Sequence, residues 1–318
     1  MKKLLISRQM PDAVMQRAQA HFDVTQRTED RPMSVPEAVA ALETHDAILA
    51  TLGDAFQADT FAGARPVRCS MIANFGVGYN HIDTAAAKLA GVRVSNTPGA
   101  VTDATADIGV MLILMAARRA SEGEMLVRAG NWGGWAPTQL LGMHIGGKTL
   151  GVVGMGRIGK AIAHRCHYGF GMDVVFFNRS EVAEPGMPAR QMASLTDLAE
   201  AADVAVVALP GGAQTHKMIG AEFFKAMRPQ AVFVNVARGD IVDETALIDA
   251  LHGGEIAGAG LDVYEREPQV PEALLSMKNV SLLPHLGTNA QDVRESMGMM
   301  ALDNLLAWNE GRDLPNPV

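Results

Sequence analysis

The sequence predicts an α/β fold that contains two doubly wound parallel sheets. Three observations support this prediction. The chain has 318 residues, which is more than a single average domain contains. Apolar segments typical of strands alternate with helical patterns in both halves, as in parallel sheets that carry helices on both faces. Between the halves, Pro98–Gly99 breaks the chain and one long apolar helix follows.

In the first half, short apolar runs predict strands, and two segments between them have helical periodicity. The helix at 34–45 begins with Ser34, a residue type that caps helix N-termini well. The predicted strands are 2–7, 22–26, 46–51, 69–75 and 92–97, and the first helix is 11–22.

The second half repeats this pattern after a segment rich in glycine and tryptophan, 128–148. That segment is too long for a simple turn and too apolar for a disordered linker. A helix at 288–311 follows the last strand, and we expect it to return to the first domain. The predicted strands are 149–155, 172–178, 203–210, 231–237, 258–263 and 280–285.

Composition excludes several classes of function. A formal net charge of −8 argues against nucleic acid as a partner. Cys69 and Cys166 lack metal-site spacing and fit a reducing cytosol, so we predict a cytoplasmic protein without a metal. The longest apolar run, Ile108–Ala117, is about half of a membrane span, which predicts a buried helix and no membrane association.

A glycine-rich turn follows the strand at 149–155. Gly154, Gly156 and Gly159 form the pattern G-x-G-x-x-G between a strand and a helix, with Met155, Arg157 and Ile158 at the intervening positions. In such turns the glycines permit a tight bend, a close approach to a pyrophosphate and close packing of the helix on the strand. The turn therefore predicts a dinucleotide site, although a flavodoxin-like turn without a dinucleotide also fits.

The end of the next strand carries Asn178, Arg179 and Ser180, where an acidic residue usually binds the ribose of NAD. Asn178 has no charge to repel a 2′-phosphate. Arg179 can bind that phosphate through its planar fork, and Ser180 can add a hydrogen bond. We therefore predict that NADPH/NADP is preferred and that NADH/NAD remains possible, with Arg179 then only a surface residue.

Three later strands end near residues that form a chemically complete set. Arg238 follows one strand, Glu267 stands in the loop after the next, and His285 follows the third. Arginine can hold a carboxylate and polarise an adjacent ketone, and histidine can donate a proton as a hydride reaches the carbon. Glutamate can orient the imidazole and favour its charged form. Each residue alone is compatible with a structural role, but together they predict a reductase site.

These motifs closely resemble those of the D-isomer-specific 2-hydroxyacid dehydrogenase family, in the same order along essentially the whole chain. They are "NFGVGYNHID", "NTPGAVTDATADIGVMLIL", "GKTLGVVGMGRIGKAIA", "NVARGDIVDE", "GLDVYEREP" and "PHLGTNA". The segments "LVRAGNWGGWAPTQLLG" and "FFNRS" are most similar to the glyoxylate/hydroxypyruvate reductase branch.

The resemblance implies two Rossmann-like domains with a cleft between them. Residues 1–99 with 289–318 would form the substrate domain, and 100–288 the dinucleotide-binding domain. A helix and arm at about 103–145 would form a homodimer, and we predict that Trp135 reaches the substrate site of the neighbouring subunit.

The resemblance also assigns site residues. Arg238, Glu267 and His285 take the catalytic roles, and Arg238 and His285 also contact the substrate. Backbone N–H groups of Leu52, Gly53, Val77 and Gly78 would hold the substrate carboxylate. Besides the glycine turn and residues 178–180, the cofactor would be lined by Thr105, Leu209, Pro210, Thr215, Val236, Ala237, Asp262 and Gly287, with Asp262 facing the nicotinamide amide.

The resulting hypothesis is NADPH-dependent reduction of small 2-keto acids, such as glyoxylate and hydroxypyruvate, to D-2-hydroxy acids, with His285 as general acid. One alternative is another 2-hydroxyacid dehydrogenase of the family with a different substrate or with NAD. Another is a non-enzymatic, nucleotide-sensing protein similar to a corepressor, which the same fold can also form.

Overall fold

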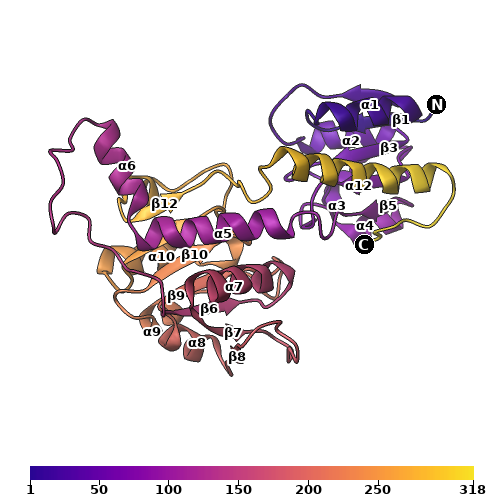
Figure 1. Cartoon of the computed structure of the whole chain (residues 1–318). Coiled ribbons are helices and arrows are strands. Elements are labelled where there is room, and N and C mark those ends of the chain that lie inside the picture. Colours follow the sequence, from indigo (N-terminus) through magenta and orange to yellow (C-terminus); the bar gives the residue numbers. More distant parts are fainter. The chain divides into compact units, whose positions relative to one another are not determined.

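The computed structural model describes all 318 residues, which divide into two compact units. Unit 1 consists of Met1–Val101 and Thr288–Val318, and unit 2 consists of Thr102–Gly287. Each unit contains one parallel sheet flanked by helices (Figure 1). The predicted α/β class with two doubly wound parallel sheets is therefore confirmed. Among the helices, none combines the length and apolarity needed to cross a bilayer.

The sheet of unit 1 has five parallel strands in the order β2-β1-β3-β4-β5, and all five were predicted. They are β1 Lys3–Ile6, β2 Asp23–Gln26, β3 Ala47–Ala50, β4 Met71–Asn74 and β5 Arg93–Ser95. The helices are α1 Asp12–His21, α2 Val35–Thr44, α3 Ala58–Gly63, α4 Thr84–Leu89 and α12 Gln291–Asn309. Ser34 and Glu37 form a capping box at the start of α2, as the sequence predicts for Ser34.

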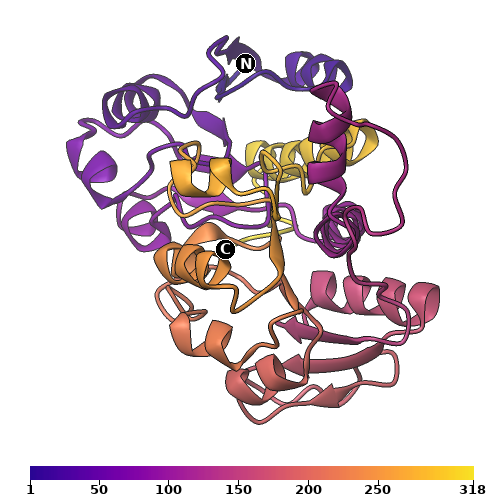
Figure 2. The same cartoon turned by 90° about the vertical axis from the view of Figure 1, so that its left-hand side faces the viewer.

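The last helix of the chain, α12, packs on the first helix. It contacts α1 and β4 and belongs to unit 1 (Figures 1 and 2). The two helices approach so closely that a Cβ at Gly298 would lie 2.5 Å from Val14 Cγ2. The glycine therefore allows α12 to lie directly against α1.

The sheet of unit 2 has seven parallel strands in the order β12-β11-β10-β9-β6-β7-β8. The chain runs from β6 toward one edge and then returns to β9 on the other side of β6, so the topological switch point lies between β6 and β9. The strands are β6 Thr149–Val153, β7 Asp173–Phe177, β8 Arg190–Gln191, β9 Val204–Val207, β10 Val232–Asn235, β11 Gly258–Leu261 and β12 Val280–Leu282. Ligands of such sheets bind at the carboxyl ends of the strands beside the switch point.

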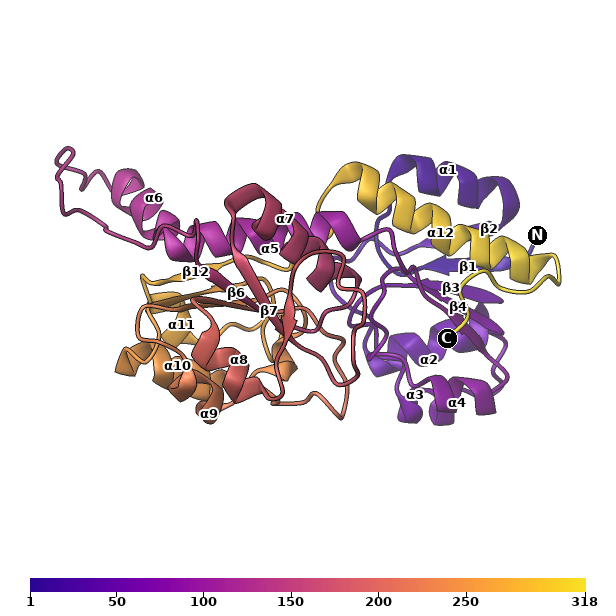
Figure 3. The same ribbon diagram turned by 60° about the horizontal axis from the view of Figure 1, so that its bottom comes forward.

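Helices cover both faces of this sheet (Figure 3). Val152 and Val153 are neighbours in β6, but Val152 packs in the core that contains Ile162 of α7, and Val153 in the core that contains Leu198 of α8. Alternate residues of a strand point to opposite faces, so both faces are apolar and need helices. The helices are α5 Thr102–Ala117, α6 Ala120–Arg128, α7 Arg157–Phe170, α8 Leu195–Ala201, α9 Ala221–Ala226, the 3₁₀ helix η1 Gly239–Ile241, α10 Glu244–Gly253 and α11 Glu272–Ser276.

The segment after α5 forms an arm, defined here as residues 119–145. Its helix α6 has no buried residue, and the loop that follows projects from unit 2 (Figures 1 and 3). Trp132 is 53% exposed and Trp135 82% exposed. Within its own unit, the arm therefore leaves large apolar side chains uncovered.

Candidate functional site

The glycine turn between β6 and α7 has a different geometry at each glycine. Gly154 has φ +100°, a left-handed conformation, and a Cβ there would lie 2.7 Å from Leu209 Cβ. A Cβ at Gly159 would lie 2.1 Å from Gly154 O, so the start of α7 is packed directly on the turn. By contrast, a Cβ at Gly156 would meet nothing within 4 Å. The turn is therefore compact on its protein side and open at Gly156, which fits a pyrophosphate there.

The loop after β7 is held by its own polar groups. Asn178 Nδ2 donates to Ser180 O at 3.0 Å and lies 3.2 Å from Ser180 Oγ. Arg179 Nη1 donates to Gln214 Oε1 in the loop after β9. The second loop contains Thr215, whose hydroxyl donates to Pro210 O at 3.0 Å. Arg179 thus connects two loops that are both predicted to line the cofactor, and Gln214 is a partner that the sequence pattern does not reveal.

Asp262, after β11, organises the loop that carries His285. Its carboxylate is 1% exposed and accepts hydrogen bonds from Leu286 N at 2.6 Å and Gly287 N at 2.9 Å. Thr105 of α5 donates to Gly287 O at 3.0 Å. Burial raises the pKa of Asp262, and the Leu286 N–H group and the charge on His285 oppose part of this rise. Three predicted cofactor residues, Thr105, Asp262 and Gly287, therefore form one contact group.

His285 has an unusual backbone conformation and a carboxylate partner. Its φ is +55°, a region that non-glycine residues rarely adopt and that is frequent at functional sites. Its N–H donates to Asp262 O at 2.9 Å. His285 Nδ1 lies 2.8 Å from Glu267 Oε2, and each side chain is 29% exposed. With Nδ1 paired, Nε2 is the nitrogen available to a substrate.

Glu267 is fixed on both oxygens. Oε1 accepts from Tyr264 N at 3.1 Å, while Oε2 contacts His285. Burial favours the neutral acid, but the hydrogen bond and charge of His285, with the charge of Arg238, hold the pKa of Glu267 below its usual value. Glu267 is therefore an ionised, oriented partner for the imidazole at neutral pH.

Arg238 lies in the turn after β10, which Asn235 holds. Asn235 Nδ2 donates to Arg238 O at 2.9 Å, and its Oδ1 accepts from Ala237 N at 3.0 Å. A Cβ at Gly239 would lie 1.8 Å from the backbone of Tyr264, so the turn lies directly against the loop of Glu267. Burial lowers the pKa of Arg238, and the charge of Glu267 acts in the opposite direction. Arginine stays protonated at neutral pH in spite of such a shift.

The structure therefore brings the three predicted catalytic side chains to neighbouring strands of unit 2, since β10, β11 and β12 are adjacent. Val236 and Ala237 are buried at the end of β10. The supporting residues Asn235 and Tyr264 were not predicted. Asn235 carried a weak signal, because it is a polar residue inside an apolar strand.

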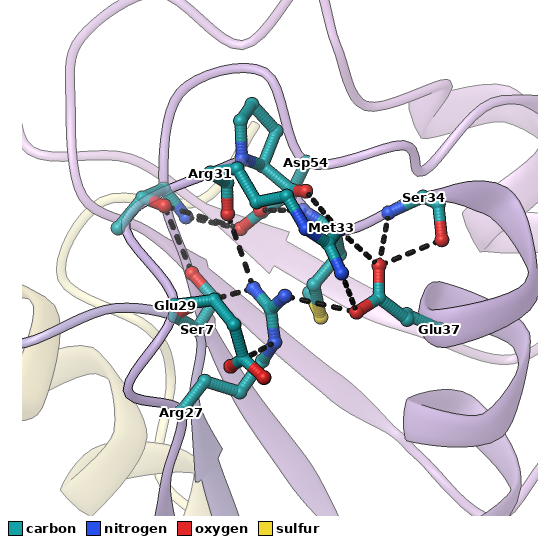
Figure 4. A network of polar contacts seen from close by, with 10 residues as sticks. Ser7, Arg27, Glu29, Arg31, Met33, Ser34, Glu37 and Asp54 are labelled. Carbon is teal, nitrogen blue, oxygen red and sulfur yellow. Dashed lines mark hydrogen bonds and ion pairs between the residues drawn. The ribbon is translucent and has the colours of Figure 1, made fainter.

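The predicted substrate loops, Leu52–Gly53 and Val77–Gly78, lie in unit 1. None of the N–H groups of these four residues donates to another group of the chain. Asp54, which is 0% exposed, accepts from Thr51 N and Met33 N at 2.8 Å each. Figure 4 shows Asp54 in a polar network with Arg27 and Glu37 of the neighbouring segment. Free N–H groups on loops braced in this way are suited to binding an anion.

Comparisons with known proteins agree with this geometry. Residues 110–287 match the family described as "D-isomer specific 2-hydroxyacid dehydrogenase, NAD binding domain". The glyoxylate reductase of Thermococcus kodakarensis is 39% identical over 321 aligned residues, covering 99% of this chain and 96% of that protein. The glycerate dehydrogenase of Hyphomicrobium methylovorum is 34% identical and covers 98% of both chains.

Solved structures give the same result. One is the NADPH-dependent glyoxylate/hydroxypyruvate reductase from Sinorhizobium meliloti in complex with NADP and malonate. It is 35% identical with a TM-score of 0.87, and the match covers 100% of this chain and 96% of that one. Because the likeness covers both units and the site residues fit a dinucleotide, the chain belongs to the D-isomer-specific 2-hydroxyacid dehydrogenases, a family of nicotinamide-dependent oxidoreductases.

Proposed function

We propose that this protein reduces small 2-keto acids, such as glyoxylate and hydroxypyruvate, to D-2-hydroxy acids, with NADPH as the preferred cofactor. The pair of His285 and Glu267, at 2.8 Å, is the observation that carries the proposal. The Thermococcus relative is named for glyoxylate reduction and the Sinorhizobium relative for glyoxylate and hydroxypyruvate reduction, which supports the choice of substrates.

In this proposal, each catalytic side chain has one task. Arg238 binds the substrate carboxylate and polarises its ketone oxygen. His285, doubly protonated and oriented through Nδ1 by Glu267, donates the Nε2 proton to that oxygen. When bound, the cofactor supplies the hydride that reaches the ketone carbon. Glu267 then keeps its hydrogen bond with the neutral imidazole, and the product is a 2-hydroxy acid.

The cofactor would be held by the turn at Gly154–Gly159 and by the loop at Asn178–Ser180. The open space at Gly156 supports a pyrophosphate there. Arg179 supports a 2′-phosphate, because its guanidinium is charged and already oriented by Gln214. Asp262 would face the nicotinamide amide. The assignment of unit 1 to the substrate and unit 2 to the cofactor is part of the same proposal.

The function is tested by turnover of a panel of 2-keto acids with NADPH, in the wild type and in Arg238→Lys. We expect glyoxylate and hydroxypyruvate to be reduced, and Arg238→Lys to lose about 10- to 100-fold in kcat/KM, because lysine cannot form the bidentate contact. The dissociation constant of NADPH, measured by fluorescence, should change much less. Absence of turnover with every 2-keto acid would refute the proposal, and equal losses in efficiency and cofactor affinity would make Arg238 structural.

We also propose that the arm forms a homodimer, with Trp135 contributing to the substrate site of the neighbouring subunit. Two tryptophans that are at least half exposed on a projecting segment support this, because large exposed apolar side chains commonly mark interfaces. Sedimentation should give the mass of a dimer, and Trp135→Ala should change the size range of accepted keto acids. A monomer at micromolar concentration would contradict the proposal.

A further inference from the structure

The loop that follows β4 separates its two kinds of backbone polar group. The carbonyls of Gly76, Val77 and Gly78 all accept hydrogen bonds from elsewhere in unit 1. The N–H groups of Val77 and Gly78 donate to nothing in the chain. Val77 is exposed and Gly78 is half-buried, so these N–H groups are accessible to a ligand. A loop with paired acceptors and accessible, unpaired donors presents positive partial charge.

Asn74 pairs two of the three carbonyls of this loop. Its side chain is 1% exposed at the end of β4, and its Nδ2 donates to Gly76 O at 2.9 Å and to Gly78 O at 3.0 Å. Its Oδ1 is buried without a hydrogen-bond partner. An unpaired buried acceptor lowers the stability of the folded chain. Asn74 thus places its amide where Nδ2 can donate to both carbonyls, although Oδ1 is left without a donor.

Asn96 and Thr97, after β5, complete the pairing. Asn96 Nδ2 donates to Val77 O at 2.8 Å, and Thr97 N donates to Gly76 O at 3.1 Å. Asn96 is half-buried, so its side chain reaches the loop from a partly solvated position. Each carbonyl from residue 76 to residue 78 therefore has a fixed donor outside the loop or at its base.

The loop after β3 shows part of the same arrangement, because one of its two carbonyls, Leu52 O, is paired. Arg8 Nη2 donates to Leu52 O at 3.0 Å, and Asp54 accepts from Thr51 N, while the N–H groups of Leu52 and Gly53 stay unpaired. Gly53 has φ +85°, and a Cβ there would lie 3.0 Å from Pro32 Cγ, so this position of the loop favours glycine.

We propose that Asn74, Asn96 and Arg8 are positioning residues for carboxylate recognition, because they pull the loop carbonyls back and leave only N–H groups to face the substrate anion. This inference rests on the proposed function, which gives these loops the carboxylate. A carbonyl that rotated toward the carboxylate would repel it, and the N–H group of the same peptide would turn away.

The test compares Asn74→Ala and Asn96→Ala with Asn279→Ala. Asn279 is a matched control, because it is a half-buried asparagine that donates to a backbone carbonyl, Ala257 O, at 3.1 Å, but in unit 2 and before β12. We expect the KM for glyoxylate to rise about 10- to 100-fold in Asn74→Ala and about 3- to 10-fold in Asn96→Ala. The KM for NADPH should stay within about twofold in each, because the residues of the cofactor proposal lie in unit 2. Asn279→Ala should lower the melting temperature and leave both KM values unchanged.

Calorimetric binding of oxamate, a non-reactive analogue of 2-keto acids, gives a second measurement that needs no turnover. Its dissociation constant in the presence of NADPH should rise in parallel with the glyoxylate KM. If Asn74→Ala does not fold, Asn96→Ala alone decides. Unchanged glyoxylate KM and oxamate affinity in Asn96→Ala would overturn the inference, even where the wild type reduces glyoxylate. A wild type that binds oxamate but reduces no keto acid would instead refute the proposed function.

Discussion

Replacing His285 with alanine should lower kcat for glyoxylate reduction by about 10²- to 10⁴-fold, which is the usual contribution of a general acid. The pairing of Nδ1 with Glu267 leaves Nε2 as the proton donor. The variant keeps Arg238 and the glycine turn, so its dissociation constant for NADPH, measured by fluorescence titration, should change little. Steady-state kinetics of the same preparation give kcat.

His252 offers a matched control for this change. It is an exposed histidine in the last turn of α10, and the side-chain hydrogen bonds and the ion pair of Arg238, Glu267 and His285 do not include it. His252→Ala should therefore have a kcat close to that of the wild type. If His285→Ala keeps more than about one tenth of the wild-type kcat, another group donates the proton, and the role of His285 is wrong.

Much of the fold could be predicted because its strands are buried on both faces and read as short apolar runs. The strands at the centre of both sheets lie where the sequence predicts them. The helices α3 and α4 were not predicted, because six residues span fewer than two turns and leave no periodicity. The edge strand β8 has only two residues, Arg190–Gln191, and pairs only with β7, so nothing apolar marks it.

The candidate site also contains residues that could be predicted from the sequence and residues that could not. Arg238 and His285 could be identified because each follows a strand, and the carboxyl ends of parallel strands meet at one edge of the sheet. The partners that orient the site could not, because their contacts depend on tertiary structure. Gln214 is 35 residues from Arg179, and Tyr264 holds Glu267 through a backbone N–H group that any residue could supply. The sequence therefore predicts the candidate catalytic residues better than the residues that orient them.

The second large effect is expected at the loop after β7, where Asn178→Asp combined with Arg179→Ala should shift the cofactor preference from NADPH toward NADH. The wild type has no carboxylate at residue 178 to repel a 2′-phosphate, and Arg179 can form one or two charge-assisted hydrogen bonds with it. Such bonds contribute about 1.5–3 kcal/mol each, which corresponds to a preference of about 10- to 1000-fold. The double variant loses these bonds and gains an acceptor for the ribose hydroxyls. The measurement is the ratio of kcat/KM for NADPH to that for NADH.

The existing contact of Arg179 sharpens this prediction. Gln214 accepts one of the two Nη1 hydrogens, so the N–H groups of Nε and Nη2 and the second hydrogen of Nη1 are left for a phosphate. Arg190→Ala is a suitable control. Arg190 is an exposed arginine on the adjacent strand β8, so its replacement removes one positive charge from the same region. That variant should keep the wild-type ratio, because Arg190 is not proposed to contact the phosphate and salt screens the long-range effect of an exposed charge more strongly than a direct contact. A wild type with equal kcat/KM for the two cofactors, or a higher value for NADH, would show that Arg179 is a surface residue held by Gln214 and not a phosphate ligand.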